Sequence, residues 1–487
     1  MKRFLLRRHG RYSFELKFRY LLNRKVRKRR NYFNIKFYLF FPYSFNINPF
    51  SYPKEHFYED QKLYLRFNTP VFTPHELTSE ENSPFIRCRE RPIHIDDYMY
   101  ETKLCGSVYK SVARDAYYKI RKRIYQESPD EWGGDVQTLV SEIAEVARHF
   151  HESARLSEDL SEEVHYHTLV IDEYISLTLE KYFIWLFDLF YTYEPSDKSA
   201  EDIKQLLQHT ISDEMDYRRQ SGYSSVSGSD ETPDSYEEYA YRAKILKRYA
   251  SDVLFFNVRR KSQGKRVEHI LYAVAAGIAM FFATAIAFLG QTTFGNLSTS
   301  LFILLVVSYM LKDRLKDIFR DLFSKSIGSF FYDRGVKVYD PRLKRKMAHV
   351  KERVSFIDTA KLPPEVRKAR SRGSFEEFLS TTASENVLLY EKSIRLNAKT
   401  LRNLHSRIKG IADINIISLR RLLRYLTVQR RDVPIVAEGK IKKLIPVKRI
   451  YHLNMVVCYQ GDDTSFVDRV RLIVDGKGIK RIEEVSR

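Results

Sequence analysis

A run of residues without a charged side chain, Ile270 to Leu289, constrains the fold of this chain more than any other feature. A helix rises 1.5 Å per residue, so about 20 residues cross the roughly 30 Å hydrocarbon core of a bilayer. A short connection follows, and a second apolar run extends from Leu297 to Leu311. The pattern predicts a two-span transmembrane helical hairpin, over residues 269–290 and 295–311. The alternative is a buried helical hairpin of a large soluble protein.

Basic residues lie on both sides of the hairpin, whereas its connection has none. They are Arg259, Arg260, Lys261, Lys265 and Arg266 before the first arm, and Lys312, Arg314, Lys316 and Arg320 after the second. Lys and Arg next to membrane spans stay on the cytoplasmic side. We therefore expect a multi-pass membrane protein with both termini in the cytoplasm. The expected location is a bacterial inner membrane.

The first arm contains small residues at four-residue spacing, which places them along one face of a helix. They are Ala275, Ala279, Ala283 and Ala287. Such a face lets another helix backbone approach closely. The favoured interpretation is packing against the second arm of the same chain, and the other is a homo-oligomer. The opposite face offers Ile278, Phe281, Phe282 and Phe288 to lipid or to a partner helix.

Composition predicts that most of the remaining chain folds in water. The 487 residues include 83 Lys and Arg against 62 Asp and Glu, a net charge of +21, and 44% are hydrophobic. The predicted fold class is an α+β membrane protein, in which the hairpin connects an N-terminal cytoplasmic α+β domain to a C-terminal domain that ends in an antiparallel β-meander. The expected segments are 1–31 (basic), 32–217 (N-terminal domain), 218–236 (flexible linker, rich in Ser, Gly and acid), 237–328 (membrane module) and 329–487 (C-terminal domain).

Basic and aromatic residues alternate through the first 30 positions, a composition that suits polyanions. The candidate contacts are Arg7, Arg8, Arg11, Arg24, Lys25, Arg27, Lys28, Arg29 and Arg30. Anionic lipid headgroups are the preferred partner, because a hairpin would already hold the chain at a bilayer. Nucleic acid is a less favoured partner, since phosphate contacts and stacked bases need the same residue types. A solvated surface is the third interpretation.

Alternating apolar residues predict strands at both ends of the chain. Residues 32–41 and 63–67 are expected to form two strands of one small sheet, and residues 451–485 a three-stranded meander. Residues 94–217 have helical periodicity, and residues 414–426 resemble an amphipathic helix.

Side chains that could hold a metal gather in the helical region, at His149, His151, His165 and His167. Their Glu-x-x-x-His spacing differs from the spacings of known di-metal and zinc sites, so surface or helix-end histidines are the favoured interpretation. No nucleotide-binding, hydrolase or kinase motif is present in the sequence. We therefore expect no cofactor, no catalytic residue and no metal site.

Three functions remain open on these grounds. The first is a non-enzymatic scaffold or sensor that acts at the cytoplasmic face of a membrane. The second is a membrane-tethered protein that binds a polyanion such as nucleic acid. The third is a membrane effector or enzyme whose site is assembled from scattered residues.

Overall fold

A computed structural model describes residues 4–22, 30–81, 83–90, 94–126, 129–159, 161–193, 198–224, 233–262, 264–294, 298–327, 332–340, 342, 344–371, 385–404, 407–408, 410–426, 430–437, 440–462 and 464–485. The chain forms two compact units. The β unit comprises Met1–Leu65, Phe256–Asn403 and Gly410–Arg487. The helical unit comprises Arg66–Phe255 and Leu404–Lys409.

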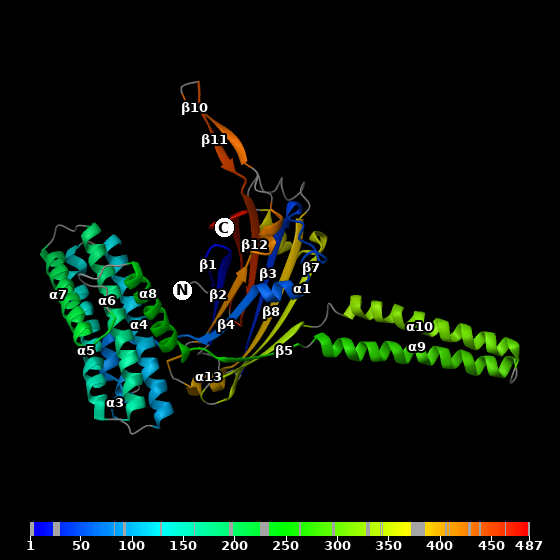
Figure 1. Cartoon of the computed structure of the whole chain (residues 1–487), viewed down its shortest axis with the longest axis horizontal. Helices are drawn as coiled ribbons and strands as arrows, with labels where there is room; N and C mark the ends of the chain where they lie inside the picture. The colour runs from blue at the N-terminus through cyan, green and yellow to red at the C-terminus, as the bar shows by residue number, and fades with distance from the viewer. Residues whose placement is uncertain are drawn as a thin grey trace. The chain divides into compact units, whose positions relative to one another are not determined.

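The larger sheet of the β unit joins strands from distant parts of the chain (Figure 1). Within the described residues its order is β14-β13-β12-β3-β8-β7-β6-β5, and all neighbouring pairs are antiparallel. The strands are β3 (Arg30–Pro42), β5 (Asn257–Ser262), β6 (Arg334–Tyr339), β7 (Lys346–Ile357), β8 (Glu385–Asn397), β12 (Tyr451–Gln460), β13 (Ser465–Asp475) and β14 (Gly478–Val485).

The central position of β3 follows from its sequence. Phe33, Ile35, Phe37 and Leu39 are all buried, as the alternation predicted. The strand lies between β12 and β8, so it does not pair with residues 63–67 as we expected. The predicted meander is present as β12, β13 and β14. Strands with a buried face pair in a defined register, because a slip of one residue would expose that face.

The smaller sheet has the order β1-β2-β9-β4, with β1 (Phe4–His9), β2 (Ser13–Leu21), β4 (Gln61–Phe67) and β9 (Gly410–Ser418). Tyr20 of β2 stacks on Tyr459 of β12 at 6.4 Å, so this sheet packs against the larger one. Between them Lys392 forms an ion pair with Asp413 at 2.7 Å, and both side chains are buried. The helix expected at 414–426 is wrong, because β9 occupies the first part of that range and a 3₁₀ turn at Leu422–Tyr425 follows.

Short elements complete the β unit. They are α1 (Lys54–Asp60), α11 (Pro364–Arg370), α13 (Ala398–Leu404), which ends at the boundary of this unit, and the hairpin of β10 (Arg430–Ala437) and β11 (Lys440–Lys448). Helix α11 packs on β12 and β13, where Val366 and Ala369 join a buried cluster with Tyr38 and Val456.

The helical unit is an antiparallel arrangement of long helices (Figure 1). Its helices are α2 (Pro74–Ser79), α3 (Pro84–Glu90), α4 (Ile95–Gln126), α5 (Pro129–Leu156), α6 (Glu162–Tyr193), α7 (Lys198–Gln220) and α8 (Pro233–Asp252). Gly106 on α4 lets α6 and α8 approach, because a Cβ atom there would lie 3.1 Å from Tyr174 and 3.5 Å from Ala250. Arg218, at the start of the expected linker, is fully buried in α7.

Two helices follow β5 and precede β6, namely α9 (Gly264–Phe294) and α10 (Thr299–Ile327). The predicted two-span transmembrane hairpin is not supported. Among the described residues one helix segment, His269–Phe294 of α9, is long and apolar enough to cross a membrane. Helix α10 fails because its apolar run ends at Leu311 and charged residues begin at Lys312. The apolar part of α10, residues 301–311, covers about 15 Å, half of what a span requires. The fold class is therefore α+β with large antiparallel sheets.

Candidate functional site

The alanine face of α9 packs against α10. Ala275 and Ala279 are fully buried, whereas Ala283 and Ala287 are half-buried. Ser308 of α10 donates a hydrogen bond to the carbonyl oxygen of Ala283 at 3.1 Å. Close approach of this kind is what small residues allow between helices.

Two contacts define the register of the pair. Ser308 lies level with Ala283, and the side chain of Leu304 lies against Gly290. Residues 280–290 of α9 therefore run alongside residues 301–311 of α10, and we call these two segments the hairpin tip. Neither segment contains a charged residue. At 1.5 Å per residue the tip is about 15 Å long.

Large apolar side chains cover the outside of the hairpin tip. Phe281 is 70% exposed and Phe302 is 67% exposed. The other exposed members are Met280, Phe282, Phe288, Leu289, Ile303, Leu305, Val306, Val307 and Met310. Monomeric soluble proteins rarely expose a contiguous apolar surface of this kind unless it binds something.

Aromatic and basic side chains meet at the end of the hairpin tip and again further from it. The ammonium group of Lys312 lies 3.7 Å from the ring centre of Tyr309. Further along, the guanidinium of Arg320 lies 4.4 Å from the ring centre of Tyr272 on α9. We call these four residues the aromatic–basic belt. Tyr rings and long basic side chains favour the level of lipid headgroups, since each combines an apolar body with a polar end.

The basic N-terminal residues are only partly described. Arg7 forms an ion pair with the buried Glu15 at 3.0 Å, and Arg8 donates to the carbonyl oxygen of Gly10. Arg11 donates to the carbonyl oxygen of Lys477. Five predicted contacts lie outside the described residues, namely Arg24, Lys25, Arg27, Lys28 and Arg29, and for Arg30 only the backbone, in β3, is described. The polyanion contact stays a prediction.

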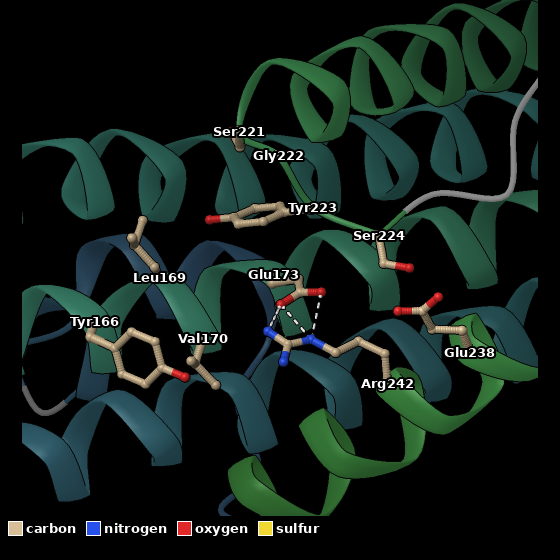
Figure 2. Close-up of a pocket in the computed structure, with 10 residues that line it drawn as sticks. All are labelled: Tyr166, Leu169, Val170, Glu173, Ser221, Gly222, Tyr223, Ser224, Glu238 and Arg242. Atoms are coloured by element: carbon tan, nitrogen blue, oxygen red, sulfur yellow. Dashed lines mark hydrogen bonds and ion pairs between the residues drawn. The ribbon is translucent and has the colours of Figure 1, made fainter. Parts of the chain in front are cut away.

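A pocket of about 390 Å³ lies in the helical unit between α6, α8 and the turn after α7 (Figure 2). Figure 2 shows Glu173 and Arg242 facing each other across it. Nε of Arg242 lies 3.1 Å from both carboxylate oxygens of Glu173, and Nη2 lies 2.5 Å from Oε2. These two charges neutralise each other, so Arg242 is not available to attract an anionic ligand.

Behind this pocket lies a buried polar network. Nδ1 of His151 contacts Asp172 at 2.6 Å, and Nε2 lies 3.4 Å from Glu214. Tyr217 and Tyr223 donate to the other oxygen of Asp172, at 2.5 and 2.8 Å. Burial lowers the pKa of His151, but the hydrogen bonds and charges of Asp172 and Glu214 outweigh it and raise the pKa to about 9. Both ring nitrogens contact carboxylates, so neither can take a proton from a substrate.

Sequence reasoning placed His151 at a surface or a helix end, and this is wrong. The histidines came from spacing along one chain segment, whereas the partners Asp172 and Glu214 lie on α6 and α7. Among the described residues no group of His, Cys, Asp and Glu could hold a metal ion. No family model, no curated protein and no solved structure matches this chain.

Proposed function

We propose that this chain is a non-enzymatic scaffold that attaches to a bilayer by inserting its hairpin tip into one leaflet. The observation that carries the proposal is the exposed apolar surface of the tip, which on α10 ends where charged residues begin at Lys312. The tip is about 15 Å long, which is half of a roughly 30 Å hydrocarbon core. The β unit and the helical unit would then be held at the membrane surface, where they can bind partners.

Burial of the exposed apolar side chains supplies the energy of insertion. Each large apolar side chain that leaves water gains about 1.5–3 kcal/mol, and many such side chains cover the tip. The helical backbone satisfies its own hydrogen bonds, as a bilayer requires. The hydroxyl groups of Thr284, Thr292 and Thr293 donate to backbone carbonyl oxygens one turn earlier, so they add little cost.

Flotation with lipid vesicles tests the attachment. We expect the purified chain to float with vesicles of phosphatidylcholine and phosphatidylglycerol. The double variant F281D/F302D should remain at the bottom of the gradient, because two carboxylates would have to enter hydrocarbon. The control is Phe50→Asp, which makes the same change at a residue of the β unit that is 96% exposed. Equal flotation of F281D/F302D and the parent chain would refute the proposal.

The depth of the tip distinguishes one leaflet from a full crossing. A tryptophan placed at Leu289, with Trp132 and Trp185 changed to Phe, reports on the far end of the tip. Insertion into one leaflet places this residue near the bilayer centre, so lipids brominated near the ends of their acyl chains should quench it most strongly. Stronger quenching by lipids brominated near the headgroup would contradict the proposed depth.

A further inference from the structure

A second cavity of the helical unit, of about 480 Å³, lies between α4, α6 and α8. Four lysines line it, Lys110 from α4, Lys181 from α6, and Lys244 and Lys247 from α8. Aromatic side chains form much of the remaining wall, at Tyr174, Tyr182, Trp185 and Tyr239. Its volume lies within the range of about 300–1,000 Å³ that is typical of small-molecule sites.

The charge of this cavity is unbalanced. Within the described part of the chain, no carboxylate forms an ion pair with any of the four lysines. The one acidic residue in the wall, Glu180, lies 3.5 Å from the buried guanidinium of Arg218. Burial, followed by the charges of Lys247 and Lys181, lowers the pKa of Lys110 to about 7. The fold therefore holds ammonium groups together at a cost that a bound anion would remove.

The aromatic wall adds a second requirement on the ligand. Trp185 meets Tyr182 edge to face at 5.5 Å, and the ammonium group of Lys181 lies 4.6 Å from the ring centre of Trp185. Trp185 lines the cavity and is 43% exposed. A planar ring can stack there, and such stacking is worth about 1–3 kcal/mol per nucleobase.

We propose that this cavity binds a nucleoside phosphate, with its base against Trp185 and its phosphates between Lys110 and Lys247. Clustered ammonium groups supply charge, and the aromatic wall supplies a stacking surface, which are the two parts of that ligand class. The pocket of Figure 2 lacks this character, because Arg242 is already paired with Glu173. The proposal is independent of membrane attachment.

Fluorescence of Trp185 provides a direct measurement, because the chain has only 2 tryptophans. In a Trp132→Phe background, ATP should quench Trp185 in a saturable manner. Adenosine lacks phosphates and tripolyphosphate lacks the ring, so each should bind at least about tenfold more weakly than ATP. Equal binding of either fragment, or binding of a single-stranded oligonucleotide without binding of ATP, would overturn the assignment.

Lysine variants locate the phosphate contacts. Lys110→Met and Lys247→Met should each weaken ATP binding about tenfold, the loss expected for one charged hydrogen bond. Lys119→Met is the matched control, because it removes the same charge from an exposed position on the same helix, α4. Far-UV circular dichroism establishes that each variant is folded. Unchanged ATP affinity in both folded cavity variants would overturn the proposal.

Discussion

His151 holds its proton more tightly in the folded helical unit than in the unfolded chain. The network of Asp172 and Glu214 raises its pKa to about 9 from the ordinary 6.5. A raised pKa means that the stabilisation is fully present below pH 6.5 and is lost as the pH rises through 9. The loss is of the order of 1–3 kcal/mol. His349 does not change the stability between pH 6.5 and pH 9, because burial and nearby lysines lower its pKa to about 4.

We predict that His151→Gln lowers the stability of the helical unit more at pH 6 than at pH 9. Both tryptophans belong to this unit, so urea unfolding followed by tryptophan fluorescence reports on it. The lowered pKa of Lys110, about 7, makes the folded unit more stable as the pH rises above 7. Comparing the variant with the parent chain at each pH cancels that contribution. A stability difference that is the same at pH 6 and pH 9 would contradict the assignment of a charged His151.

Side chains such as His151 and Lys110 could not be assigned from the sequence. Their properties depend on groups brought from other helices, and a spacing pattern along one helix contains no information about those groups. The exposed phenylalanines of α9 were predicted correctly, because the hydrophobic period alone places Phe281 and Phe288 away from the alanine face.

At the scale of elements, two glycines within helices have opposite surroundings. Gly106 on α4 faces Tyr174, Ile171 and Ala250, whereas nothing lies within 4 Å of a Cβ atom added at Gly134 on α5. Glycine within a helix is less favourable than alanine by about 0.5–1 kcal/mol. Replacing it therefore raises the stability only where the new side chain has space.

We predict that Gly106→Val destabilises the helical unit by about 1–3 kcal/mol, because the branched side chain must displace α6 or α8. Gly134→Ala should leave its stability unchanged or raise it by up to about 1 kcal/mol. Urea unfolding monitored by tryptophan fluorescence measures both. If Gly106→Val were as stable as the parent chain, the close approach of these helices would be refuted.

Elements with one strong period were predictable, whereas those with mixed signals were not. Buried and exposed residues alternate in β3 from Asn31 to Phe37, and Asp475 to Gly478 form the turn between β13 and β14. The helix predicted over residues 414–426 is wrong because β9 and the following 3₁₀ turn together imitate helical spacing. The second apolar run approaches the length of a span only if the polar residues before Leu301 are counted, and the charges after Leu311 restrict its apolar part to about half a bilayer.

At the scale of the molecule, the order of strands could not be read from the sequence. Strand β3 pairs with β8 and β12, which lie far from it in the sequence. A pattern within one short segment contains no information about such distant partners. The β unit is consequently built from three separate stretches, and most of the helical unit, Arg66–Phe255, lies between the first two in the sequence. A pattern of alternation identifies a strand and its buried face, but it does not specify the partner strand.

The connection of the hairpin to the β unit yields the last prediction. Helices α9 and α10 lie between β5 and β6, and these strands pair directly, with Ser262 opposite Arg334. Asp333 stabilises the return to the sheet, because its carboxylate accepts from Tyr58 at 3.0 Å and from the backbone of Val354 at 2.9 Å. The pairing of β5 with β6 and the hydrogen bonds of Asp333 therefore stabilise the sheet where the chain leaves it for the hairpin and returns.

We predict that replacing residues 264–331 with a short Gly-Ser loop leaves the β unit folded. Two adjacent antiparallel strands need only a short loop, so the sheet keeps its register without the helices. The variant should retain the β-sheet signal and the thermal midpoint of the parent chain within a few degrees, remain in solution without detergent and no longer float with vesicles. Loss of the β-sheet signal would mean that the hairpin supports the fold, whereas retained flotation would mean that another surface binds lipid.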